Sequence, residues 1–173
     1  MLREIKKYGD PVLKKSAEKV EIIDDEIRTI LSDMAETMYE APGVGLAGPQ
    51  IGIGKRLVVI DVDGVLRKII NPVILEYSQD LENSEEGCLS VPGVYEKVKR
   101  AKKITVRYKN ENGEEVTEEA EGLLARAFQH EIDHLDGVLF VDKLSPIGKK
   151  LASQKLMRLK KDTLKKLKKG DKE

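Results

Sequence analysis

Two histidines and a glutamate at helical spacing are the residues of this chain best suited to chemistry. His130 and His134 are four positions apart, and Glu131 directly follows the first of them. Residues four apart lie on one face of a helix, so both imidazoles can reach the same metal ion. Glu131 lies about 100° round the helix from His130, close enough to act on a water bound to that metal. The sequence contains no other histidine, and the pattern therefore predicts a metal site.

A third metal ligand must come from another part of the chain. A helical histidine pair gives two ligands, whereas a catalytic site usually has three protein ligands and a water. Phe140 stands where a metzincin has its third histidine, which argues against that class of protease. Asp142 is one candidate, as a downstream carboxylate of the kind found in thermolysin-like proteases. Cys88, the single cysteine, is the other, because a thiolate is a strong soft ligand and Gly87 beside it permits close backbone approach.

The elements around these residues predict an α+β fold. We expect antiparallel β-sheets around a central metal-binding helix, followed by a C-terminal helix. A helix capped by Asp24 or Asp25 should end at Ala41-Pro42-Gly43, and Asn71-Pro72 should end a strand. The expected strands cover 56–61, 65–70, about 104–108 and 114–120, and the later helices cover 122–135 and 146–169. We expect a catalytic domain over 1–147 and a basic helix or tail over 148–173.

Composition excludes several other classes of protein. The 173 residues are 40% hydrophobic, which fits one domain of ordinary size, and only 4% are aromatic, which disfavours a stacking surface for single-stranded nucleic acid. No apolar run approaches the roughly 18–20 residues that span a bilayer, and the opening lacks the apolar core of a signal peptide. One cysteine allows no intrachain disulfide, so we expect a cytoplasmic location. We expect neither a membrane nor DNA as a partner.

Three motifs together resemble those of the peptide deformylase family, and in particular its bacterial type I group. They are Glu-Gly-Cys-Leu-Ser at 86–90, Gln-His-Glu-Ile-Asp-His at 129–134 and Gly-Val-Gly-Leu-Ala-Gly-Pro-Gln at 43–50. They occur in the family's order and with similar separations, and the resemblance extends from 9–13 to 144–146. Gly48 is a departure, because the family commonly has an alanine there. We expect the lost methyl to loosen packing beside Gln50 without removing a reacting group.

The resemblance implies hydrolysis of the N-formyl group from the initiator formyl-methionine of nascent polypeptides, with release of formate. It implies one divalent metal per chain, with water as the fourth ligand; Fe²⁺ is the expected ion in cells, and Zn²⁺, Ni²⁺ or Co²⁺ are possible substitutes. A metal-bound water attacks, and Glu131 acts as general base and then general acid. The side-chain amide of Gln50 and the backbone N–H of Leu89 stabilise the charge on the oxygen. The implied metal ligands are Cys88, His130 and His134.

Substrate residues are expected partly from their own types and partly from the resemblance. The resemblance implies that Gly45 and Gly87 lie near the substrate backbone, with Leu123, Ala127 and His130 around the methionine pocket. The Gly43–Gly45 segment should pair with an extended peptide as an added strand. Leu123 and Ala127 share a helix face and should surround the methionine side chain. Glu86 should form hydrogen bonds that orient a metal-binding histidine or a backbone turn. The full expected set is Gly43, Val44, Gly45, Glu86, Gly87, Leu123 and Ala127.

The C-terminal end is strongly basic. Residues 149–173 contain eleven Lys or Arg and three Asp or Glu, a balance of +8, so residues 1–148 carry −8. A solvated charged helix is the simplest interpretation, and its narrow, non-aromatic apolar stripe disfavours a membrane-surface helix. The stripe consists of Ala152, Leu156, Leu159 and Leu167. The resemblance favours docking of this helix on the ribosome, where a basic face suits RNA phosphates and protein near the exit tunnel.

Two other functions fit part of the pattern. A small zincin-type endopeptidase has the same helix, but replacement of Cys88 by alanine should then matter little. A ribosome- or RNA-binding module could hold a structural metal, although structural zinc sites usually have four protein ligands. Glu131 would have no task in such a module, so full activity of a Glu131→Ala variant would favour it.

Overall fold

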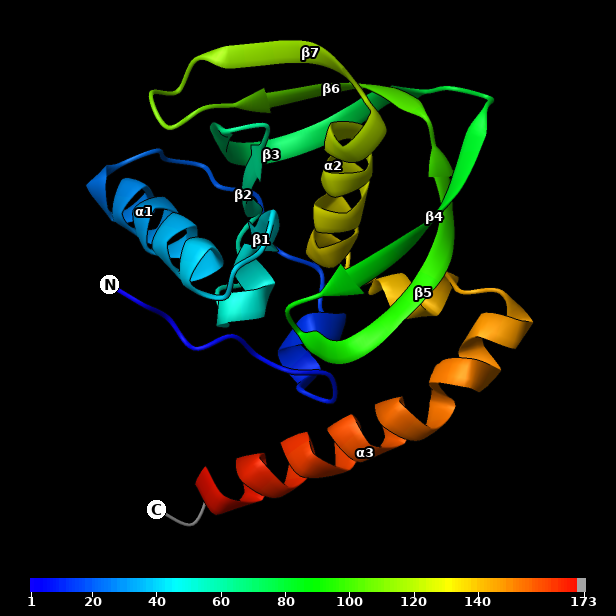
Figure 1. Ribbon diagram of the computed structural model, residues 1–173. Helices are drawn as coiled ribbons and strands as arrows, with labels where there is room; N and C mark the ends of the chain where they lie inside the picture. Colours follow the sequence, from blue (N-terminus) through cyan, green and yellow to red (C-terminus); the bar gives the residue numbers. More distant parts are fainter. Residues whose placement is uncertain (171–173) are drawn as a thin grey trace.

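The computed structural model describes residues 1–170 and confirms the predicted α+β fold. Helix α2 (Gly122–Leu135) lies at the centre, with β-strands around it and helix α3 (Pro146–Gly170) running below (Figure 1). All strand pairs within the two sheets are antiparallel. The other main elements are α1 (Asp25–Glu40), β1 (Gly45–Ala47), β2 (Leu57–Val62), β3 (Val65–Tyr77), β4 (Leu81–Cys88), β5 (Val91–Ala101), β6 (Lys103–Lys109) and β7 (Glu115–Glu121).

The larger sheet has five strands in the order β1-β2-β3-β6-β7, and helices cover both of its faces. Strand β2 runs between α1 and α2 (Figure 1), which explains why its first four residues, 57–60, are all apolar and buried rather than alternating. Val58 and Ile60 pack with Phe128 of α2, whereas Leu57 and Val59 pack in the cluster that contains α1. The two faces of one strand thus fix both helices relative to the sheet.

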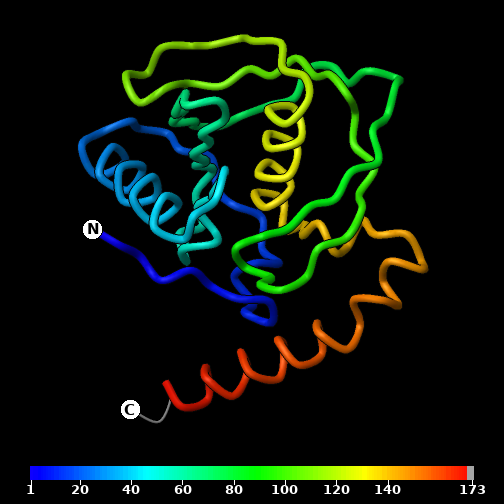
Figure 2. Tube along the Cα trace, viewed as in Figure 1, coloured from blue at the N-terminus to red at the C-terminus, as the bar shows by residue number. Residues whose placement is uncertain are grey.

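Strands β4 and β5 form a separate two-stranded sheet that curves round α2. The tube in Figure 2 shows this hairpin closing the side of the molecule opposite α1. A turn at Leu89 and Ser90 joins the strands, with Cys88 opposite Val91. No strand was predicted in this region, because β4 is mostly polar and exposed and lacks a clear apolar alternation.

The predicted end of a strand at Asn71-Pro72 is wrong. Strand β3 continues to Tyr77, with a register shift between Ile70 and Val73 that places the proline in an irregular stretch. Asn71 adopts a left-handed φ of 52°, and its side chain exchanges two hydrogen bonds with the backbone of Val20. Asn71 and Pro72 do interrupt the regular strand geometry, but contacts with the rest of the fold allow the strand to continue beyond them.

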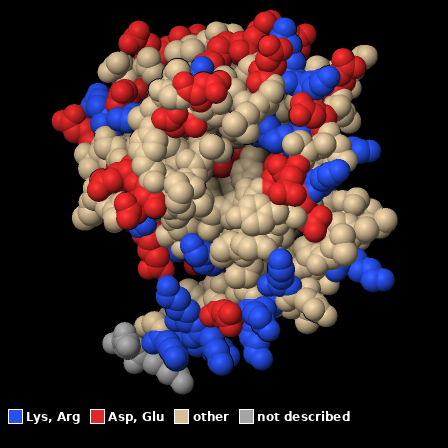
Figure 3. Space-filling view, in the orientation of Figure 1, with Lys and Arg blue, Asp and Glu red and all other residues tan. Residues whose placement is uncertain are grey.

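Helix α3 packs below the hairpin along part of its apolar stripe. Ala152 is buried, and Leu156 and Leu159 are partly buried against the cluster that contains Val91, Val94 and Val98 of the hairpin, whereas Leu167 is exposed, so the stripe is covered only in the first part of the helix. The basic side chains gather at the lower edge of the molecule (Figure 3). The predicted tail includes residues 171–173, which lie outside the described residues. Within residues 1–170, no helix is long and apolar enough to cross a membrane.

Candidate active site

A cleft of about 560 Å³ opens beside the amino-terminal half of α2. It is visible as a hollow near the middle of the face in Figure 3. Its walls come from the glycine-rich segment around β1, the tip of the β4–β5 hairpin and α2. Two residues proposed from the sequence do not line the cleft: His134, which is buried, and Asp142, the alternative ligand. The cleft brings together the other proposed site residues: Gly43, Val44, Gly45, Gln50, Glu86, Gly87, Cys88, Leu89, Leu123, Ala127, His130 and Glu131.

Three potential metal ligands converge at the inner end of this cleft. One ligand atom from each of Cys88, His130 and His134 lies within 4.8 Å of the other two. Sγ of Cys88 lies 3.4 Å from Nε2 of His134. One thiolate and two imidazoles form a donor set that suits a borderline divalent cation. Asp142 is occupied elsewhere, because it bonds Lys14 at 2.8 Å and the backbone N–H of Leu139 at 2.9 Å.

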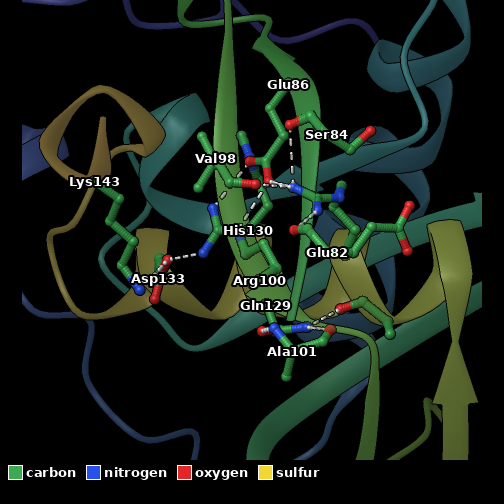
Figure 4. Close-up of polar contacts among 12 residues, drawn as sticks. Glu82, Ser84, Glu86, Val98, Arg100, Ala101, Gln129, His130, Asp133 and Lys143 are labelled. Carbon is green, nitrogen blue, oxygen red and sulfur yellow. Dashed lines mark hydrogen bonds and ion pairs between the residues drawn. The ribbon is translucent and has the colours of Figure 1, made fainter. Parts of the chain in front are cut away.

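A buried carboxylate orients the first histidine. Nδ1 of His130 lies 2.8 Å from Oε1 of Glu86, which leaves Nε2 facing the other ligands. Burial alone would raise the pKa of Glu86, but hydrogen bonds from Arg100 and His130 hold it well below its usual range. Figure 4 shows these side chains meeting between α2 and the hairpin.

The two histidines have opposite protonation tendencies. Burial lowers the pKa of His130, but the Cys88 sulfur and the Glu86 carboxylate outweigh it and raise the pKa to about 10. A cation held by His130 would therefore have to compete with a proton. The pKa of His134 is well below its usual value, first because of burial and then because of the neighbouring His130 charge. A neutral imidazole of this kind already has a free electron pair for a metal.

Glu131 is placed to exchange a proton near neutral pH. Burial, reinforced by the Glu86 charge and opposed by His130, raises its pKa to about 7. Its Oε2 atom is buried without a hydrogen-bond partner among the described residues. Gly45 leaves room for it, because a Cβ there would lie 2.9 Å from Cγ of Glu131. A carboxyl group with this pKa can act as base and then as acid.

Gln50 and Leu89 approach the metal ligands from two separate elements. Gln50 is buried in the short 3₁₀ helix Gly48–Ile51, where its Oε1 accepts a hydrogen bond from the N–H of Ala47 at 2.9 Å. The amide nitrogen must therefore point inward, and it lies 3.1 Å from Oγ of Ser90 and 3.5 Å from Sγ of Cys88. Leu89 lies in the hairpin turn directly after Cys88.

The expected loosening at Gly48 is wrong. A Cβ at this position would lie 2.6 Å from the carbonyl oxygen of Lys55 and 2.9 Å from that of Ile53. The backbone of the following loop occupies the space that a methyl group would need. A methyl group would need this loop to shift, so its absence leaves no gap beside Gln50.

Several cleft residues were not predicted from the sequence. Lys7 donates a hydrogen bond of 3.3 Å to the carbonyl of Leu89, and the ring of Tyr95 packs where Gly87 has no side chain. Nothing in the local sequence marks either of them. Arg126 also lines the cleft, and it could have been noticed, because it precedes His130 by one helical turn.

Comparison with known proteins decides the family. A sequence profile described as polypeptide deformylase matches residues 2–150. The chain belongs to the peptide deformylase family. Peptide deformylase from Fusobacterium nucleatum is 55% identical over 166 residues, which cover 94% of this chain and 95% of the relative. As a member of the family, the chain is a hydrolase that removes the N-formyl group from nascent polypeptides.

Solved peptide deformylases share this fold over most of the chain. The Thermotoga maritima structure is 48% identical, has a TM-score of 0.83 and covers 84% of this chain and 99% of its own. The Thermus thermophilus structure is 43% identical with a TM-score of 0.87, covering 94% and 99%. Peptide deformylases are metal-dependent, and the Cys88, His130 and His134 group is able to bind a metal.

Proposed function

We propose that this peptide deformylase hydrolyses the formyl group of formyl-methionine with one divalent metal held by Cys88, His130 and His134. The observation that supports this assignment is the convergence of the three ligand atoms within 4.8 Å, beside a buried glutamate. When bound, the metal supplies a Lewis acid that brings the pKa of a water close to neutrality. Fe²⁺ is the proposed ion in cells, with Zn²⁺, Ni²⁺ and Co²⁺ as substitutes.

Glu131 carries the proton in this mechanism. Its carboxylate takes a proton from the attacking water and delivers it to the amine that leaves. The same group serves both steps because its pKa of about 7 makes either protonation state accessible near neutral pH. Burial keeps solvent from competing for the proton.

Gln50 and Leu89 are proposed to stabilise the negative charge that develops on the formyl oxygen. The Nε2–H of Gln50 and the backbone N–H of Leu89 are the donors. The hydrogen bond from Ala47 fixes the Gln50 amide in one orientation before substrate arrives. Donors that need no reorganisation are the most effective in catalysis.

The peptide backbone is proposed to pair with the free edge of β1. This strand is the edge of the five-stranded sheet, and β2 pairs with it on one side only, opposite Gly45 to Ala47. Gly43, Val44 and Gly45 line the cleft next to this edge, and Glu86, Gly87, Leu123 and Ala127 line it around the proposed methionine pocket. An extended chain added here would bring its first residue to the inner end of the cleft.

We also propose a cytoplasmic enzyme that docks on the ribosome through α3. The support is the set of exposed basic side chains on this helix, which includes Lys161, Lys165 and Lys168. Basic side chains gather at the lower edge of the molecule, where this helix runs (Figure 3). Glutamine at these three positions should weaken co-sedimentation with ribosomes, and rising salt should weaken that of the unaltered chain. The docking proposal would be contradicted if co-sedimentation of the unaltered chain did not depend on salt and the glutamine variant co-sedimented equally well.

Formate release from a formyl-Met-Ala-Ser peptide tests the enzymatic proposal. The protein is purified without oxygen, and its metal content is measured alongside. Rapid release by the parent and its loss in a folded, metallated Glu131→Ala variant are expected. No release from a fully metallated, folded parent would overturn the proposal and turn attention to endopeptidase substrates. The peptide deformylase of Synechococcus elongatus has been solved in complex with actinonin, and we expect actinonin to inhibit this chain.

A further inference from the structure

The proposed metal ligands lie on two elements that no strand pairing joins. His130 and His134 lie on α2, whereas Cys88 lies at the tip of the β4–β5 hairpin, which forms a sheet of its own. Side chains therefore have to fix the hairpin on the helix. The position of the sulfur relative to the imidazoles depends on those side chains.

Arg126 of α2 makes the most extensive of these connections. Its Nη2 donates a hydrogen bond of 2.7 Å to the carbonyl of Glu82, and its Nη1 lies 2.9 Å from the carbonyl of Val98 and 3.4 Å from that of Ser84. Nη1 also lies 2.5 Å from Oε2 of Glu86. One guanidinium thus bonds both strands of the hairpin, as Figure 4 shows for its acceptors.

Apart from the two histidines, the other side chains of α2 that bond the hairpin do so at the far end of β5, away from Cys88 along the strands. Gln129 exchanges two hydrogen bonds with the backbone of Ala101, at the last residue of β5, and Asp133 pairs with Arg100 beside it. Arg126 instead bonds Glu86, two residues before Cys88. Within residues 1–170, Arg126 and Gln129 are the side chains of α2 that bond the backbone of the hairpin. Of these two, Arg126 lines the cleft.

We propose that Arg126 is a positioning residue for the metal site. It sets where Cys88 stands relative to His130 by fixing the hairpin on α2 and by holding the carboxylate that orients His130. The guanidinium is suited to this because its planar fork serves several acceptors at once, which a lysine ammonium on a flexible stem does not do in the same geometry. This inference rests on the proposed metal site.

The test uses the full chain loaded with Co²⁺. A thiolate-to-cobalt absorption band reports the sulfur, the visible spectrum reports ligand geometry, and transfer to a chelator gives the rate of metal loss. Arg126→Met and Arg126→Lys should lose Co²⁺ about 10-fold faster than the parent and show a shifted spectrum, by analogy with the loss of other groups that support metal ligands. Arg67→Met is the matched control, because Arg67 pairs with Glu118 on the five-stranded sheet.

The possible results separate the two proposals. If a folded Arg126→Lys variant keeps the parent spectrum and rate of metal loss, the positioning role is wrong. If Arg67→Met accelerates metal loss as much, the effect is general destabilisation and the role is also wrong. If the unaltered chain binds no Co²⁺ or shows no thiolate band, the metal site itself is wrong. Should Arg126→Met fail to fold, Arg126→Lys, which keeps the charge and the stem, carries the test alone.

Discussion

Replacing Gln50 by leucine should separate catalysis from metal binding. Leucine fills a similar space but has no N–H to offer the formyl oxygen. Loss of a comparable donor in other enzymes lowers kcat about 100- to 1,000-fold, or about 2.7–4 kcal/mol. KM should change much less, because the charge on the oxygen develops only in the transition state. The variant retains all three proposed metal ligands and loses only the long 3.5 Å contact to Cys88, so metal content should stay at the parent level.

A loss of stability should accompany the loss of rate. The N–H of Ala47 is buried and donates to Oε1 of Gln50, so it becomes an unsatisfied donor in the variant. Such a group costs about 1–3 kcal/mol. The free energy of unfolding should fall by that amount, and urea titration of the metallated proteins at equal concentration measures it.

Ser90→Ala provides the matched control for Gln50. It removes one contact of the Gln50 amide, at 3.1 Å, but leaves the donor and its hydrogen bond from Ala47 in place. This variant should lose about 0.5–1.5 kcal/mol of stability and much less of kcat than Gln50→Leu. A folded, fully metallated Gln50→Leu protein that keeps kcat within a few-fold of the parent would refute the oxyanion role of Gln50.

Three further variants test the surroundings of the site. Gly48→Ala should lower the free energy of unfolding by about 1–3 kcal/mol, because its Cβ meets the carbonyl of Lys55; an unchanged urea midpoint would contradict the close packing. Lys7→Met should lower kcat more than it raises KM, because Lys7 holds the carbonyl of Leu89; a change confined to KM would instead assign Lys7 to substrate binding. Glu86 has a depressed pKa, so its stabilising effect is present above the unfolded pKa and lost as pH falls below it. Thermal unfolding of a metal-free Glu86→Gln variant should therefore depend less on pH below about 4.5, and parallel curves for the two proteins would argue against this.

The grouping of the candidate ligands Cys88, His130 and His134 could be predicted from the sequence, but the elements that hold them in place could not. The His130 to His134 spacing predicts one helix face, since helical geometry is local. Strand β4 was not predicted because its residues are largely polar. Its position is set by tertiary contacts such as those of Arg126. Gly48 was misjudged for the same reason. The carbonyl oxygen that excludes a methyl group there belongs to Lys55, seven positions later. A lysine in the sequence does not indicate a close backbone contact.

The first residues of the chain form hydrogen bonds that support the candidate site, although they lie far from its motifs in the sequence. The backbone N–H of Lys6 donates to the carbonyl of Gln50 at 2.6 Å, and that of Tyr8 donates to the carbonyl of Ser90 at 2.8 Å. Three consecutive residues, with Lys7 between these two, thus join the helix that carries one proposed oxyanion donor to the turn that carries the other. Backbone hydrogen bonds of this kind require no particular side chain, so the sequence has no motif for them. Two donors on unconnected elements can act on a single oxygen only if something fixes their separation, and this segment does so.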